Sequence, residues 1–121
     1  MKDKKVILIM SNDRNQREQM VCDIRNDSLN PNELYFYFAR NPDDVRAILE
    51  TVDIFIIVFL AQTGQANSNR FAVSSLRSLF RGEIICGATE KADRMALQGT
   101  ECDLILEPDE VARTVLDFVE L

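Results

Sequence analysis

One uninterrupted apolar run, residues 52–61, dominates the sequence, and its single charged residue is Asp53 near the start. A strand with one face in water alternates polar and apolar residues, and this run does not. Uninterrupted Ile, Val and Phe over this length is typical of a strand that is buried on both faces. Such strands lie inside a parallel sheet between two layers of helices. The rest of the chain is therefore expected to supply flanking strands and covering helices.

Strand-like and helix-like segments alternate along the whole chain. The expected strands are 6–10, 33–39, 52–60, 83–88 and 103–106. The expected helices are 14–25, a helix beginning at 41–44, 70–80, 90–98 and a last helix from 108 onward, with 61–69 as a polar loop. Five strand–helix units with connections of this length predict an α/β fold with a parallel sheet and helices on both faces.

Size and charge narrow the classes of protein. The 121 residues suit one domain, 1–121, and the net charge of −6 argues against binding nucleic acid or anionic membranes non-specifically. No apolar run reaches the roughly 18 residues of a membrane span. Residues 1–5 are followed by only five apolar residues, too few for a signal-peptide core. A cytoplasmic location is therefore expected.

The cysteines argue against a metal centre. Cys22, Cys86 and Cys102 are far apart, no CxxC pair occurs, and the chain has no histidine. A zinc site of the usual kind is excluded by that pattern, and no cofactor or other metal ion is predicted. Three buried, reduced thiols are expected, with a redox switch between Cys86 and Cys102 as the alternative to quiet packing.

Several short motifs in the right order resemble the receiver domain of two-component response regulators over the whole chain. The matching pieces are 52–57 for the third strand, 99–103 before the fifth strand, and Glu107-Pro108 after it. The resemblance implies a flavodoxin-like (βα)5 three-layer sandwich with a five-stranded parallel sheet in the order 2-1-3-4-5. The chemotaxis receiver is the standard example of that order.

A working receiver binds Mg²⁺ and accepts a phosphoryl group on an aspartate, and its site residues are carried over one position at a time. The acid pair falls on Ser11 and Asn12, which leaves Asp13 as the only carboxylate of that turn. The phosphoacceptor falls on Val58. The hydroxyl position falls on Ala88, or on Thr89 if the alignment slips by one residue. The aromatic switch position is Leu104, and the lysine position is Glu107.

These substitutions predict a degenerate receiver, or pseudo-receiver, with no catalytic residue. Val58 has no nucleophilic atom, and Glu107 would repel phosphate where a lysine would attract it. The leading hypothesis is a non-enzymatic signalling module that acts through protein–protein contacts without phosphorylation. In the family, contacts or homodimers often form on the fourth helix, fifth strand and fifth helix, here 90–98 and 108–121. The rival hypothesis is a small-molecule-binding domain that uses the crevice at the carboxyl ends of the strands.

Some residues keep two interpretations. Asp13 is expected to cap a helix, with a residual metal ligand as the alternative. Asp53 is expected to be a turn residue at the start of the strand, with a nucleophile as the alternative. Glu107 is either a solvated acid or the partner of an arginine in a polar cluster with Ser11 and Asn12. The aromatic residues 35–38 are expected to pack partly in the core of an edge strand, with an association surface as the alternative.

Overall fold

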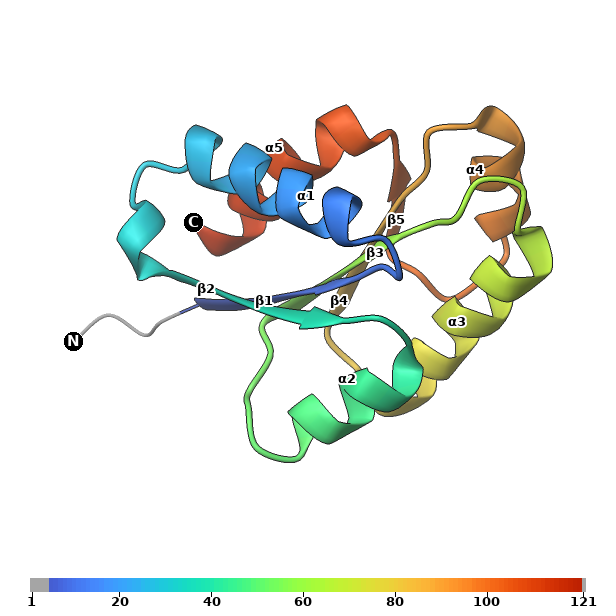
Figure 1. Ribbon diagram of the computed structural model, residues 1–121, viewed down its shortest axis with the longest axis horizontal. Helices are drawn as coiled ribbons and strands as arrows, with labels where there is room; N and C mark the ends of the chain where they lie inside the picture. Colours follow the sequence, from blue (N-terminus) through green and yellow to red (C-terminus); the bar gives the residue numbers. More distant parts are fainter. Residues whose placement is uncertain (1–4, 121) are drawn as a thin grey trace.

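In the computed structural model, which describes residues 5–120, five parallel strands form one sheet between two layers of helices (Figure 1). The strands are β1 (Lys5–Met10), β2 (Leu34–Ala39), β3 (Ile56–Leu60), β4 (Glu83–Gly87) and β5 (Leu104–Leu106). The helices are α1 (Arg14–Asp27), α2 (Pro42–Leu49), α3 (Ala66–Leu79), α4 (Lys91–Leu97) and α5 (Pro108–Val119), with a short 3-10 turn, η1 (Pro31–Glu33), before β2.

The sheet order is β2-β1-β3-β4-β5, with every neighbouring pair parallel. The predicted flavodoxin-like fold is therefore confirmed. The chain begins on β1, adds β2 on one side and then crosses to add β3 on the other. This reversal of strand order lies between β1 and β3, and open sheets of this type bind ligands beside such a reversal.

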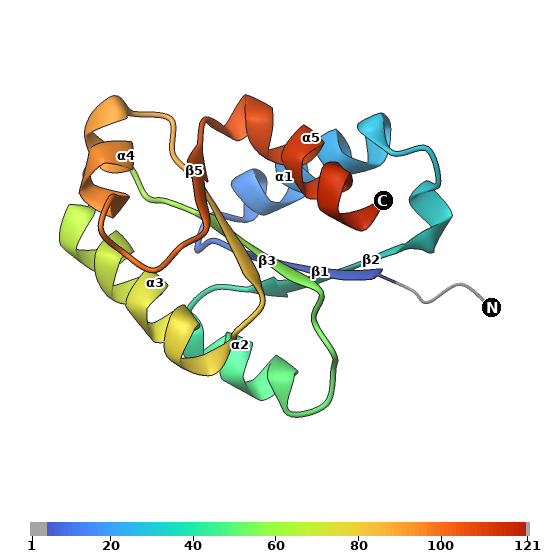
Figure 2. The same cartoon turned by 180° about the vertical axis from the view of Figure 1, so that it is seen from behind.

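Two apolar clusters fill the two faces of the sheet. Helices α1 and α5 cover one face, and α2, α3 and α4 cover the other, as the opposite view in Figure 2 also shows. All five residues of β3 are buried, as expected of a central strand. The helical faces predicted from Met20, Val21 and Ile24 in α1 are buried too.

The long apolar run is a strand over only half its length, which corrects the expected strand 52–60. After α2, the Val52 amide still donates to the Ile48 carbonyl at 2.9 Å, so the chain is finishing a helical turn there. Pairing with β1 begins after the Phe55 amide bonds to the Val6 carbonyl at 2.9 Å. Asp53 is exposed and precedes the strand, as expected of a turn residue.

Two other expectations are wrong. Helix α3 begins at Ala66, inside the segment 61–69 that was expected to be a loop. The thiols are also not all buried: Cys22 is exposed on α1, Cys102 is partly exposed, and Cys86 alone is fully buried. The aromatic strand β2 does lie at the sheet edge, where Tyr35, Tyr37 and Phe38 are between 38% and 46% exposed.

Candidate functional site

The carboxyl ends of the strands bring most of the predicted site positions to one edge, but Val58 is not at that edge. Val58 is the third residue of β3, fully buried, and belongs to the apolar cluster under α1 and α5. The strand reaches the edge two residues later, at Leu60, which is followed by buried Ala61. Val58, Leu60 and Ala61 therefore place hydrocarbon side chains along the carboxyl half of β3 and at its end.

Ser11 follows β1, and its hydroxyl is fully used inside the protein. The side chain is buried, donates to Gln16 Oε1 at 2.8 Å and accepts from the Asp13 amide at 3.1 Å. The Ser11 carbonyl accepts from Arg17 Nη1 at 2.6 Å. Asn12 is exposed. Apart from the carboxylate of Asp13, the turn is built from neutral groups and one guanidinium.

Asp13 caps helix α1, which is the function expected of it. Its Oδ1 accepts the backbone amides of Asn15 at 2.8 Å and Gln16 at 3.3 Å. These bonds satisfy two of the free N–H groups of the first helical turn. Within residues 5–120, no three acidic, Cys or His side chains gather as metal ligands.

At the ends of β4 and β5, an arginine that the sequence analysis missed connects three predicted positions. Arg94 of α4 donates through Nη1 to the carbonyls of Ala88 at 2.8 Å and Thr89 at 2.7 Å. Its Nη2 lies 3.4 Å from Glu107 Oε1, and its side chain is 22% exposed against 55% for the glutamate. Glu107 is therefore the partner of an arginine and also partly solvated.

The wider polar cluster with Ser11 and Asn12 is not formed. The hydrogen bonds of Ser11 described above go to its own turn and to α1, not to Arg94 or Glu107. Leu104, at the aromatic switch position, is partly buried against the α1/α5 cluster. The only sequence signal for Arg94 was its place in the fourth helix, because nothing local specifies which arginine faces the end of β5.

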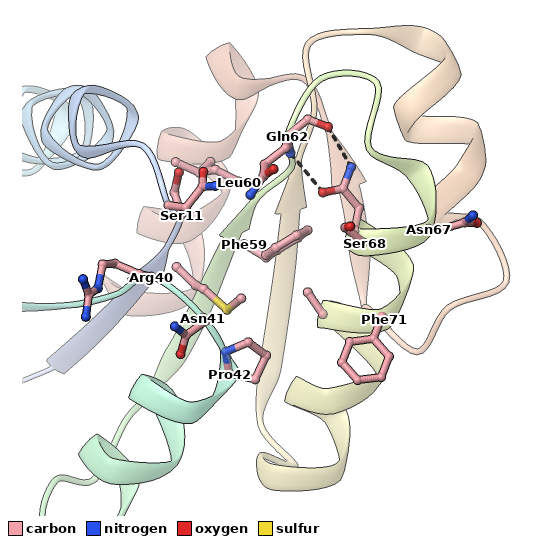
Figure 3. A pocket seen from close by; sticks show the side chains of 14 residues that line it. Ser11, Arg40, Asn41, Pro42, Phe59, Leu60, Gln62, Asn67, Ser68 and Phe71 are labelled. Carbon is pink, nitrogen blue, oxygen red and sulfur yellow. Dashed lines mark hydrogen bonds between the residues drawn. The ribbon is translucent and has the colours of Figure 1, made fainter.

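A cavity of about 380 Å³ opens where the strand order reverses, between β1, β3, α2 and α3 (Figure 3). We call it the switch-point cavity. Its wall combines apolar and amide side chains, and Arg40 is the one charged residue among the described residues that line it. The lining residues are Met10, Ser11, Asn12, Arg40, Asn41, Pro42, Phe59, Leu60, Gln62, Asn67, Ser68, Asn69, Phe71 and Ala72.

Two hydrogen bonds between the Asn69 side chain and the Gln62 backbone hold the loop beside this cavity, and they are drawn as dashed lines in Figure 3. Asn69 is buried; its side-chain oxygen accepts a hydrogen bond from the backbone N–H of Gln62 at 3.0 Å, and its side-chain nitrogen donates to the backbone carbonyl of Gln62 at 2.9 Å. Two residues further along the chain, the Gly64 amide lies 3.2 Å from both carboxylate oxygens of Asp93, which is buried on α4. The loop between β3 and α3 is thus held at Gln62 and at Gly64.

The expected contact face, 90–98 and 108–121, consists of α4, α5 and their flanks, with Leu121 outside the described residues. Met95 is 57% exposed in the middle of α4. Buried residues of α5 face the sheet, as the sequence predicted from Val111, Val115 and Val119. Among the described residues, no helix is long and apolar enough to span a membrane.

By sequence alone, no protein-family profile and no curated protein matches the chain. By structure, it is similar to the RcsB response regulator of Salmonella typhimurium, with a TM-score of 0.73 and 8% identity over 98% of this chain and 61% of that one. The chain therefore spans less than two thirds of RcsB. It is also similar to TrrA of Thermotoga maritima, solved with Mg²⁺ and BeF, with a TM-score of 0.72 and 15% identity over 94% of this chain and 98% of that one.

A third similar structure is a CheY-like receiver domain from Methanospirillum hungatei, with a TM-score of 0.67 and 12% identity over 96% of this chain and 90% of that one. At identities this low the similarity concerns the fold, and the chemistry of the site has to be argued from this chain's own residues. The structural neighbours are response regulator receiver domains, and the chain has their fold.

Proposed function

We propose that this chain is a pseudo-receiver: a non-enzymatic signalling module of two-component type that acts through protein–protein contacts without being phosphorylated. The observation that carries the proposal is the apolar end of β3. Val58, Leu60 and Ala61 are each at most 6% exposed and carry no nucleophilic atom. Phosphoryl transfer to a receiver requires a carboxylate at this position.

The electrostatics of the same edge support the proposal. Mg²⁺ prefers carboxylate oxygens; in the β1 turn the Ser11 hydroxyl is already bonded to Gln16, and the carboxylate of Asp13 already caps α1. A phosphoryl group needs a cation to offset its charge, and the residue after β5 is Glu107. The guanidinium of Arg94 at this edge is already paired with this glutamate. The edge therefore suits neither the metal ion nor the phosphoryl group.

We further propose that α4 and the exposed side of α5 form the contact face. Met95 presents an exposed thioether side chain, which adapts well to a partner surface. The partner is another signalling protein or a second copy of this chain. Nothing in the acidic composition favours nucleic acid, because such binding needs a basic surface.

The test is incubation with Mg²⁺ and acetyl phosphate, followed by intact mass spectrometry of the wild-type chain and of a phosphorylatable receiver treated in parallel. We expect the second protein alone to gain a phosphoryl group. A phosphorylated aspartate or glutamate in this chain, mapped to the strand edge, would overturn the proposal. For the contact face, Met95→Glu should weaken partner binding or self-association, whereas Phe71→Glu on α3 should not.

The second candidate is small-molecule binding, and the switch-point cavity is the observation that favours it. Ligand cavities commonly measure about 300–1,000 Å³ and combine apolar walls with a few polar groups. The cavity of about 380 Å³ matches that description and lies at the strand-order reversal. Its single guanidinium and several amides suit a small, planar, anionic molecule such as a nucleotide or a flavin.

A thermal-shift series with nucleotides, flavins and Mg²⁺ separates the two candidates. A ligand at 100 times its Kd adds about 2.7 kcal/mol of stability, which raises the melting temperature by several degrees. If the cavity binds the ligand, Arg40→Ala should reduce the shift, whereas Arg70→Ala on the exposed part of α3 should not. The absence of any shift across the series would leave the signalling module as the only proposal.

A further inference from the structure

Cys86 on β4 and Cys102, two residues before β5, are joined by a side-chain hydrogen bond. Cys86 lies on β4, is fully buried and belongs to the apolar cluster beneath α2, α3 and α4. Cys102 lies in the segment between α4 and β5, is partly exposed and packs against the same cluster. Cys102 is therefore partly accessible to solvent, and Cys86 is enclosed in the protein.

The surroundings of the two thiols shift their pKa values in opposite directions. A hydrogen bond from the Cys86 side chain, with help from Thr100, lowers the pKa of Cys102 to about 6 despite partial burial. The Thr100 hydroxyl lies 3.2 Å from the Cys102 sulfur. The contact with Cys102, together with burial, raises the pKa of the Cys86 thiol. At neutral pH, Cys102 is thus the thiolate and Cys86 holds the shared proton.

The segment that carries Cys102 is fixed on both sides of the sulfur. Arg77 of α3 donates to the Glu101 carbonyl at 2.9 Å and to Asp103 Oδ2 at 2.8 Å. The Asp103 amide donates to the Ile84 carbonyl on β4 at 2.9 Å. These bonds hold Cys102 against β4, so that the two thiols stay together without a covalent bond.

We propose that Cys102 is an oxidation site for hydroperoxides and that Cys86 resolves the product into an intramolecular disulfide. The Cys102 thiolate attacks the hydroxyl oxygen of the peroxide. An S–O bond forms, the O–O bond breaks, and the leaving alkoxide or hydroxide takes a proton from water. Cys86 then attacks the resulting sulfenic sulfur. The S–S bond forms, the S–O bond breaks, and the hydroxide leaves as water with the Cys86 proton.

The balance is a two-electron oxidation of two thiols by one hydroperoxide, which is reduced to water or to an alcohol and water. The bond would close the chain on either side of α4 and so fasten that helix between β4 and β5. The oxidation chemistry does not depend on the proposed signalling function, because it needs only the two sulfurs and the peroxide.

The test uses the full chain with Cys22→Ser, which removes the exposed thiol of α1. After reduction, stoichiometric hydrogen peroxide should lower the intact mass by two hydrogens, and a reductant should reverse the change. Non-reduced trypsin digestion should then yield peptide 82–91 linked to peptide 95–113, because cleavage follows Arg81, Lys91, Arg94 and Arg113. A product that gains oxygen without this linkage would overturn the proposal.

Variants separate the two roles. Cys86→Ser should stop at a sulfenic acid on Cys102 that dimedone traps, and Cys102→Ser should leave Cys86 unreacted. Equal oxidation of Cys102→Ser and the parent chain would overturn the assignment. In the wild type, iodoacetamide labelling of Cys102 should level off above about pH 7, whereas labelling of free cysteine in solution should keep rising toward about pH 8.5. Identical profiles would also overturn it, and this measurement needs no variant to fold.

Discussion

Arg77 is predicted to be the most important single side chain for holding the β4–β5 side of the molecule together. Its guanidinium donates to the carbonyls of Phe80 at 3.1 Å, Gly82 at 2.9 Å and Glu101 at 2.9 Å, and to Asp103 Oδ2 at 2.8 Å. The side chain is only 17% exposed. It thus ties the end of α3 to the turn before β4 and to the segment before β5.

The magnitude follows from these four bonds. A hydrogen bond contributes about 0.5–1.5 kcal/mol net, and the lower half of that range applies because most of the acceptors can be hydrated when the arginine is removed. Four bonds then give about 2–4 kcal/mol for Arg77→Ala, to which lost packing of the side-chain stem adds. With a urea m-value of about 2 kcal/mol/M, the unfolding midpoint should fall by about 1–2 M.

The matched control is Arg70→Ala, an exposed arginine on the same helix, which should change stability by less than about 0.5 kcal/mol. Arg77→Lys should behave nearly like the alanine variant, because an ammonium group cannot reach acceptors in four directions as the guanidinium fork does. Urea unfolding followed by circular dichroism measures all three. Equal midpoints for Arg77→Ala and Arg70→Ala would refute the reasoning.

Three further predictions concern other parts of the fold. Arg40, chiefly through a hydrogen bond from its backbone amide, lowers the pKa of Asp44 below the ordinary value of 3.8. The stability that this interaction contributes is therefore present above about pH 3.8 and is lost as the pH falls further. Wild type and Asp44→Ala should accordingly become equally stable when their unfolding is compared in acid. Val58→Asp should prevent folding instead of creating a phosphoacceptor, because it buries a carboxylate within β3, and a soluble, phosphorylatable variant would contradict this. Gly99→Ala should lower the melting temperature by a few degrees in calorimetry, because its φ of +87° strains any Cβ; an unchanged temperature would contradict that.

The order of strands and helices was predictable because it depends on patterns within short stretches of sequence, such as apolar runs and helix-start residues. Buried strands read as continuous apolar runs, and Asn41 with Pro42 marks the start of α2 through chemistry that is local to four residues. The strand order came from resemblance and could not come from hydrophobicity, because every inner strand has the same pattern. The structure supplied that order independently.

The boundaries that failed depend on contacts that are distant in sequence. Residues 66–69 read as loop because Asn and Ser favour turns, yet Asn69 bonds both polar groups of the Gln62 backbone and so supports the first turn of α3. The start of β3 was missed because Ile54 packs against the core before strand pairing begins, so apolar character extends beyond the ladder. The Arg94–Glu107 pair joins α4 to the end of β5 and leaves no local signature.

The hydrogen bond between the Gly64 amide and the Asp93 carboxylate links the loop after β3 to helix α4. A single carboxylate on α4 holds the tip of the loop that borders the switch-point cavity, and both groups sit far from either chain end. Moving that loop outward would either break the hydrogen bond between Gly64 and Asp93 or move α4 with the loop. This contact physically connects the loop beside the cavity to α4, and it does so without any covalent modification of the chain.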